Sequence, residues 1–215
     1  MAFQFYTGRR LIELTGCKAH NLPELLAHLK DVDDSAIFYH THERYMTHHF
    51  TKAEFYNDFA EWISRALLEP AAAEKLAAID MLEFTSIRAL REALAKGVES
   101  ALAANGGRVR ECPPGDEFHF CKVKSFIMPT GMVAENLEQF ATSLPRSTNS
   151  SVFFHFFEAR LRLERKTNDF SLWLTDLGER RLADAIERLD PYTMTLEKLR
   201  KQIYVMCRRR LAEKQ

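Results

Sequence analysis

Two histidine–glutamate pairs are the residues in the sequence best suited to catalysis or ligand binding. They are His40-x-x-Glu43 and His155-x-x-Glu158. Residues three apart on a helix share a face, so each His and Glu can point towards one site. Imidazole and carboxylate side chains of this kind hold metal ions inside helical bundles. The spacing therefore raises the hypothesis of a metal or small-anion site between the two segments.

Two aspartates, Asp58 and Asp169, can join the same site if the helix that follows each pair packs alongside it. The order of the pairs is reversed from the Glu-x-x-His of known bundle sites, and each helix lacks a second carboxylate. A buried His bonded to a nearby Glu or Asp also satisfies polar groups that would otherwise destabilise the fold. We favour this structural interpretation and keep a metal or catalytic site as the alternative.

Additional histidines follow the first pair, at His42, His48 and His49. If the segment is a strand, His40 and His42 face the same way, as metal-binding pairs do. If it is a helix, the two side chains diverge. The second segment has Phe157 where the first has His42, so such a site exists once only. We favour a solvent-facing polar patch near a loop.

The paired motifs belong to a longer internal repeat. Between Thr15 and Glu43, an offset of 130 − 15 = 115 brings ten identical residue pairs into register without a gap. The match resumes at an offset of 168 − 57 = 111, where Asn-Asp-Phe recurs and Trp62 meets Trp173, the only two tryptophans. We predict an internal duplication in which both tryptophans are structural. The copies are residues 1–104 and 118–215, joined by a Gly- and Pro-rich linker at 105–117.

Each copy has a similar pattern of expected elements. Alternating β-branched and aromatic residues predict strands at Phe3–Leu14 and Phe118–Met128, each followed by a Thr-Gly turn. An Asn three residues before Glu or Gln predicts a helix start, and so does an Asn followed by an Asp in the first turn. The structural asparagines expected at helix starts are Asn21, Asn136, Asn57 and Asn168.

The remaining elements of each copy are expected to be helices. The first spans about Leu22–Leu29, and the histidine-bearing element is read as a helix, with a strand left open. Amphipathic stretches close the copies at Ala71–Ile79, Ile87–Ala104, Leu182–Leu189 and Leu196–Leu211. The expected fold class is α+β and predominantly helical, a strand-plus-four-helix unit present twice. We expect the two copies to pack about a pseudo-twofold axis as one compact domain.

Composition restricts the function classes. Lys plus Arg and Asp plus Glu are each 30, so the formal net charge is zero. Proteins that bind nucleic acid or anionic membranes through their whole surface are clearly basic. The first 104 residues carry 11 − 15 = −4 and the rest 19 − 15 = +4. These complementary halves suit docking between copies, and nucleic-acid binding by the basic half remains a weak alternative.

The expected location is cytoplasmic. The four cysteines are scattered, without zinc-site spacing, which indicates reduced thiols. The N-terminal residues do not have the pattern of a secretory signal peptide. Apolar runs are shorter than the roughly 18 residues of a membrane span, so no membrane association is expected.

Three strings resemble a family of bacterial proteins whose function is unknown. They are Thr15–Leu25 (TGCKAHNLPEL), Ile37–His42 (IFYHTH) and Asn57–Trp62 (NDFAEW). The resemblance runs through most of the chain and implies a bacterial cytoplasmic origin. It brings no catalytic residues with it.

The sequence leads to a ranked set of functions. The first is a non-enzymatic interaction or regulatory protein without a cofactor, which acts as a homo-oligomer or with a protein partner. The absence of a known catalytic motif favours it. The second is an enzyme or sensor with a metal or small anion held by the His/Glu cluster.

Overall fold

The computed structural model describes residues 2–44, 55–106 and 108–214. The chain is mostly helical with a two-stranded sheet, which confirms the predicted α+β class. Within the described ranges, the helices are too short or too polar to cross a membrane.

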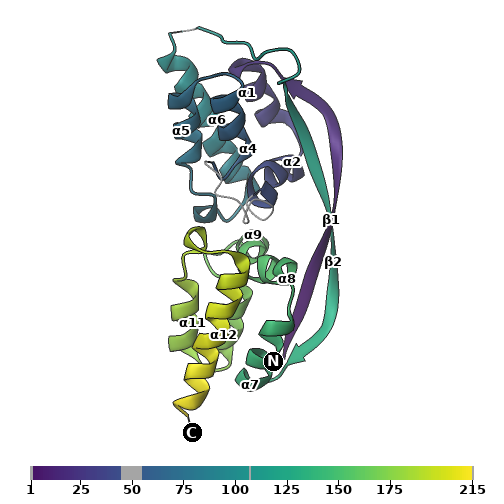
Figure 1. The fold of residues 1–215 in the computed structure, drawn as a ribbon, viewed down its shortest axis with the longest axis vertical. Helices are drawn as coiled ribbons and strands as arrows, with labels where there is room; N and C mark the ends of the chain where they lie inside the picture. Colours follow the sequence, from purple (N-terminus) through teal and green to yellow (C-terminus); the bar gives the residue numbers. More distant parts are fainter. Residues whose placement is uncertain (1, 45–54, 107, 215) are drawn as a thin grey trace. The chain divides into compact units, whose positions relative to one another are not determined.

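The sheet is a ribbon formed by β1 (Phe3–Ala19) and β2 (Phe118–Ala134), whose arrowheads point in opposite directions in Figure 1. Both strands are longer than predicted, and the expected Thr-Gly turns are wrong. Gly16 has a φ of +83° inside β1, a left-handed conformation that glycine adopts without strain. The hydroxyl of Thr15 donates to the carbonyl of Phe120 at 2.8 Å, so side-chain bonding holds the strands together beside this irregular residue.

The chain forms two compact units that share the ribbon. Unit 1 comprises Met1–Arg9 and Ser125–Gln215, and unit 2 comprises Arg10–Lys124. These boundaries differ from those of the predicted copies. The first residues of β1 belong to the unit of the helices that follow β2, and the first residues of β2 belong to the unit of the helices that follow β1. Phe5 stacks on Phe140 in unit 1, at 5.6 Å between ring centroids. The duplication itself and the pseudo-twofold axis stay predictions.

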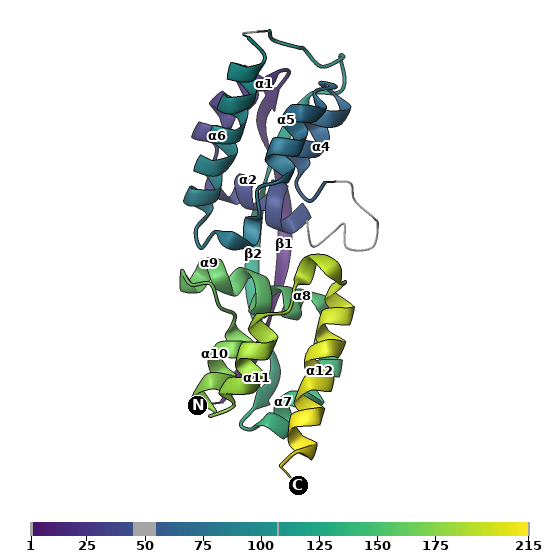
Figure 2. The ribbon, with the colours of Figure 1, turned by 90° about the vertical axis from the view of Figure 1, so that its left-hand side faces the viewer.

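Unit 2 contains the helices that follow β1. In Figure 2, α1 lies beside α6, while α4 lies beside α5. The bounds are α1 Leu22–Asp31, α2 Asp34–Phe38, a π-helical turn Tyr39–Glu43, α4 Asp58–Arg65, α5 Pro70–Ala77, a 3-10 turn Met81–Glu83 and α6 Ile87–Ala104.

Unit 1 contains the helices that follow β2, in a similar order. Helix α10 packs against α11, and α12 packs against α7. The bounds are α7 Leu137–Ser143, a 3-10 turn Leu144–Arg146, α8 Asn149–Phe153, a π-helical turn Phe154–Glu158, α9 Ala159–Leu163, α10 Asp169–Asp176, α11 Arg180–Glu187, a 3-10 turn Pro191–Thr193 and α12 Leu196–Ala212.

The helix starts follow from side-chain caps. The side-chain oxygen of each expected asparagine accepts a backbone N–H three residues on, which satisfies a donor that the helix itself leaves unpaired. The capped donors belong to Glu24, Gln139, Ala60 and Ser171, and the capping residues are Asn21, Asn136, Asn57 and Asn168.

The histidine-bearing segments are helical, so the strand alternative is wrong. Helix α2 continues into the π-helical turn Tyr39–Glu43, and α8 continues into Phe154–Glu158. A π-helical turn contains an extra residue, which changes the direction in which its side chains point, and such turns occur frequently at functional sites. The first turn carries the candidate histidines His40 and His42, and the second carries His155.

Candidate functional site

His155 joins a helix of unit 1 to the beginning of β1. Its Nδ1 lies 2.7 Å from Oδ2 of Asp169 on α10, and its Nε2 accepts the backbone N–H of Tyr6 at 2.8 Å. Because the backbone amide can only donate, Nε2 must carry a lone pair. Nδ1 therefore carries the proton and donates it to the carboxylate. The geometry selects a neutral imidazole in a single tautomer.

His40 makes the same arrangement in unit 2. Its Nδ1 lies 2.8 Å from Oδ2 of Asp58 on α4, and the backbone N–H of Cys121 donates to its Nε2 at 2.9 Å. The structure thus brings each predicted His together with its predicted Asp. The third member of each set is a strand amide, which depends on backbone position and cannot be read from residue type.

Aromatic rings enclose both imidazoles. Phe3 lies 4.9 Å from the His155 ring centroid, and Phe118 lies 4.7 Å from that of His40. The two histidines are 2% and 4% exposed. Burial lowers the pKa of His155, since removing water disfavours the charged form more than the Asp169 carboxylate favours it. The aromatic surroundings and the accepted amide bond both favour the neutral ring.

An arginine neutralises each aspartate. A terminal guanidinium nitrogen of Arg162 lies 2.5 Å from Oδ2 of Asp169, and Nε of Arg44 lies 2.8 Å from Oδ1 of Asp58. Sequence reasoning missed both arginines, because they do not occupy equivalent positions in the repeat alignment. Their only sequence signal is that each follows its histidine by a few residues.

The two glutamates do not form the predicted pairs with the histidines. Glu43 lies against Arg10, with Nε and Oε2 2.9 Å apart, and both side chains are almost fully buried. Glu158 is half-buried. The expected shared face assumes α-helical spacing, whereas each His–Glu segment is a π-helical turn.

His42 is a buried residue, so the prediction of a solvent-facing patch is wrong for it. It stacks on Phe38 with ring centroids 5.3 Å apart, and its Nδ1 lies 3.1 Å from the Thr41 hydroxyl. Burial lowers the pKa of His42 to about 4. His48 and His49 lie outside the described residues.

These contacts have a consequence for metal binding. Across residues 2–44, 55–106 and 108–214, no three His, Cys, Asp or Glu side chains are grouped as a metal site would require. Metal coordination by His40 or His155 needs a free imidazole lone pair, and the lone pair of each Nε2 is used by a strand amide. The metal alternative stays a prediction without a ligand set in this part of the structure.

The tryptophans lie beside the two histidine sites. The indole N–H of Trp62 donates to the carbonyl of Asp116 at 2.7 Å, which fastens the segment before β2 onto α4. Trp173 packs against Phe140, with ring centroids 5.1 Å apart. In unit 1 the Trp173 side of α10 also borders a cavity of about 450 Å³. This cavity reaches His155, Asp169 and Arg162.

Comparisons with known proteins agree with the fold. OrfY from Thermoproteus tenax has a similar structure, with a TM-score of 0.81 and 27% sequence identity, over 97% of this chain and 95% of that chain. A search of curated proteins finds no match. The bacterial origin and cytoplasmic location stay predictions. The model of a family of unknown function, DUF5752, matches residues 1–208, and the chain therefore belongs to that family.

Proposed function

We propose that the protein is a non-enzymatic interaction protein that binds an extended segment of a partner protein along its β ribbon. The observation that carries this proposal is the exposure of large apolar side chains on the strands. In unit 2, Leu11 and Leu14 are 52% and 74% exposed. In unit 1, Phe126 and Ile127 are 48% and 42% exposed. Large apolar side chains that stay exposed on one structural element favour an interaction surface there.

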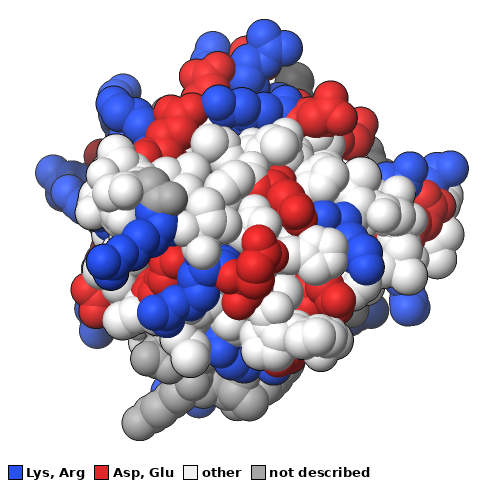
Figure 3. All heavy atoms as spheres, turned by 90° about the horizontal axis from the view of Figure 1, so that it is seen from above, with Lys and Arg blue, Asp and Glu red and all other residues white. Residues whose placement is uncertain are grey.

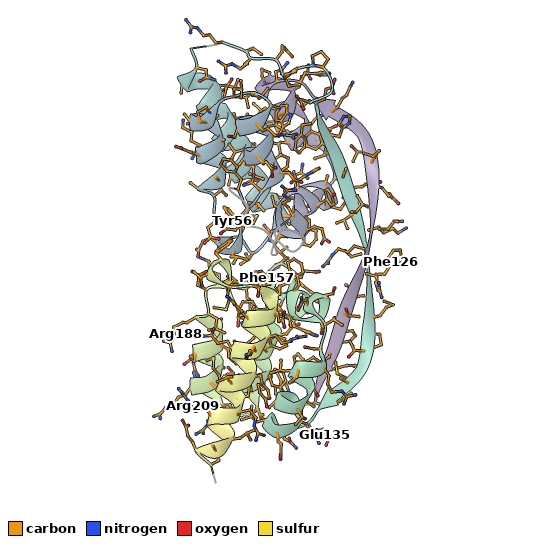
Figure 4. All side chains as sticks on the ribbon, viewed as in Figure 1. Tyr56, Phe126, Glu135, Phe157, Arg188 and Arg209 are labelled. Atoms are coloured by element: carbon orange, nitrogen blue, oxygen red, sulfur yellow. The ribbon has the colours of Figure 1, made fainter. Side chains whose placement is uncertain are left out.

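The orientation of Phe126 supports a surface role. Its side chain, labelled in Figure 4, lies on the side of the ribbon that faces away from the helices of unit 1. The inward-facing residues Phe5 and Phe120 are completely buried. The strands therefore use their ends to complete the two cores, while the apolar side chains of their central part remain accessible to a partner.

The ribbon also has strand edges without a β-strand partner in the described part of the chain. The sheet of the described chain contains only β1 and β2, so each strand has one edge that the other does not cover. An added strand can bind such an edge through main-chain hydrogen bonds, with alternate side chains giving specificity. An extended peptide is the ligand that fits this arrangement.

Charge identifies the kind of segment. The exposed charged residues of the ribbon include Arg9, Lys18 and Lys124, which are all basic. Glu13 lies 3.4 Å from Lys122 and is balanced by it. A second copy of the ribbon would bring like charges together, whereas acidic side chains would complement them. We therefore favour a partner segment in which acidic and apolar residues alternate.

The histidine sites support a non-catalytic role. Both ring nitrogens of His40 and of His155 make hydrogen bonds that hold the fold. A general base or a metal ligand requires an available nitrogen in contact with the substrate or the ion. The proposal thus gives His40 and His155 a structural role and places the binding function on the ribbon surface.

Nucleic-acid binding has less support. On the face drawn in Figure 3, acidic and basic side chains are interspersed among uncharged residues. Binding to a phosphate backbone instead draws on clusters of Lys and Arg on one face. The formal net charge of zero points the same way.

Fluorescence anisotropy with a labelled peptide of alternating glutamate and valine tests the proposal. We expect binding that weakens with salt, and weaker binding by Phe126→Lys and Lys124→Glu variants. Val205, which is 49% exposed on α12 away from the strands, gives the matched control Val205→Lys. Equal loss in the control would contradict the proposal, as would equal binding of a lysine–valine peptide. If sedimentation analysis shows a dimer that does not bind the peptide, the partner on the ribbon is a second copy of the chain.

A further inference from the structure

The cavity in unit 1 suggests a second binding site, which shares Ile127 with the ribbon surface. It is a pocket open to solvent, and its volume of about 450 Å³ is within the range of small-molecule sites. Its walls come from the start of β1, from Ile127 of β2, from the π-helical turn and from one face of α10. The lining includes the aromatic side chains of Phe3, Tyr6, Phe154 and Trp173.

Helix α10 supplies the polar groups along one wall. Asp169, Leu172, Trp173 and Asp176 all line the cavity. Their spacing of three, four and seven residues places them on a single helical face. Two carboxylates therefore lie at the two ends of an apolar wall, separated by roughly 10 Å along the helix axis.

The two carboxylates differ in their surroundings. Asp169 receives the His155 Nδ1–H and lies 2.5 Å from Arg162, whose guanidinium stacks over Phe154 at 4.7 Å. Its charge is thus balanced within the protein. Asp176 is exposed and has no cationic partner among the described residues. The cavity carries one unbalanced negative charge, at the Asp176 end.

From this arrangement we infer that the unit 1 cavity binds a small organic cation, an amine with an aromatic or aliphatic body. The ammonium group lies near Asp176, and the apolar body lies along Leu172 and Trp173. Aromatic faces attract cations through their electron-rich surfaces, and a nearby carboxylate adds to that attraction. An anionic ligand would be repelled by the two carboxylates, because the arginine of the cavity, Arg162, is already paired with Asp169.

The corresponding face of unit 2 gives an internal comparison. By the predicted alignment, Asp176 corresponds to 176 − 111 = 65, which is Arg65, and Leu172 corresponds to Glu61. The charge at the far end of this face is therefore reversed. The inferred site belongs to unit 1 alone and goes beyond the proposed interaction function.

Nuclear magnetic resonance of the two indole N–H groups in the full-length protein tests the inference. Trp62→Phe and Trp173→Phe variants assign the two signals. Phenethylamine is the probe, and phenethyl alcohol and phenylacetate are its neutral and anionic counterparts. We expect phenethylamine to shift the Trp173 signal in a saturable way, leave the Trp62 signal in place, and bind more tightly than either counterpart.

Substitution of the carboxylate provides the second readout. Asp176→Asn should weaken phenethylamine binding about two- to fivefold, the effect of a partly exposed charge pair, and leave phenethyl alcohol unaffected. Asp184→Asn, an exposed aspartate on α11, is the matched control and should change neither. The inference is overturned if phenethylamine leaves the Trp173 signal unchanged, if the alcohol or phenylacetate binds equally well, or if Asp176→Asn and Asp184→Asn behave alike.

Discussion

The imidazole of His155 accepts a hydrogen bond from the backbone N–H of Tyr6, a residue 149 positions earlier in the chain. This bond fastens the first strand to helices encoded in the last third of the sequence. His40 holds the backbone of Cys121 in the same way. The two histidines that looked best suited to chemistry therefore connect strand and helix.

Replacing His155 with alanine should reduce the free energy of unfolding by about 2–4 kcal/mol. The substitution removes a buried ring and leaves the Tyr6 N–H and the Asp169 carboxylate without their partner. Urea unfolding near neutral pH measures the change. His119→Ala, at an exposed position on β2, is the control and should change stability by less than about 0.5 kcal/mol. A folded His155→Ala protein of unchanged stability that has lost a bound metal would support the metal hypothesis instead.

Replacing His42 with phenylalanine should reduce the amount by which the free energy of unfolding falls in acid. The pKa of His42 is about 4 in the folded protein, below its ordinary value of 6.5. The stability that depends on the neutral ring is complete above pH 6.5, and it is lost as the pH falls from 6.5 towards about 4. The lost contribution reaches about 3 kcal/mol.

The natural comparison for this variant is Phe157, which stacks on Phe153 with ring centroids 5.2 Å apart. His42 stacks on Phe38 at 5.3 Å, so a phenylalanine ring fits the same kind of contact. Chemical unfolding at a series of pH values measures how steeply the free energy of unfolding changes with pH. Part of the slope should remain, because the pKa of His155 is lowered too. An identical pH dependence in the variant and the original protein would refute the assignment to His42.

Replacing Gly16 with alanine should destabilise unit 2 by about 1 kcal/mol. No atom lies within 4 Å of a Cβ added there, so the cost comes from the positive φ of +83° rather than from a clash. Gly16→Asn should cost less, because asparagine adopts the left-handed conformation more readily than alanine. Thermal unfolding of the two variants gives the comparison. Equal stability of Gly16→Ala and the original protein would argue against the left-handed conformation.

Local side-chain patterns made the helices predictable from sequence. The cap residues Asn21 and Asn136 and the apolar periodicity of Ile87–Ala104 depend only on neighbours in the chain. The strand ends were not predicted, because Thr15-Gly16 has the composition of a turn. Its left-handed glycine lies inside a strand whose pairing continues through distant residues such as Phe120.

The composition of the site was only partly predictable. The repeat pointed to His40 and Asp58, since His40 recurs as His155 at an offset of 155 − 40 = 115 and Asp58 recurs as Asp169 at an offset of 169 − 58 = 111. A missed signal lies upstream, where Phe3-x-Phe5 and Phe118-x-Phe120 are also separated by 118 − 3 = 115. The Cys121 backbone contact was not predictable, because a backbone donor leaves no trace in residue type.

The central claim is that the buried histidines hold the fold as neutral rings. Long-range nitrogen–proton correlation spectra of histidine-labelled protein near neutral pH test it most directly. For His40 and His155, assigned by substitution, the account predicts a proton on Nδ1 and none on Nε2. An Nε2–H tautomer, a rapid exchange of tautomers, or a charged ring at that pH would contradict it.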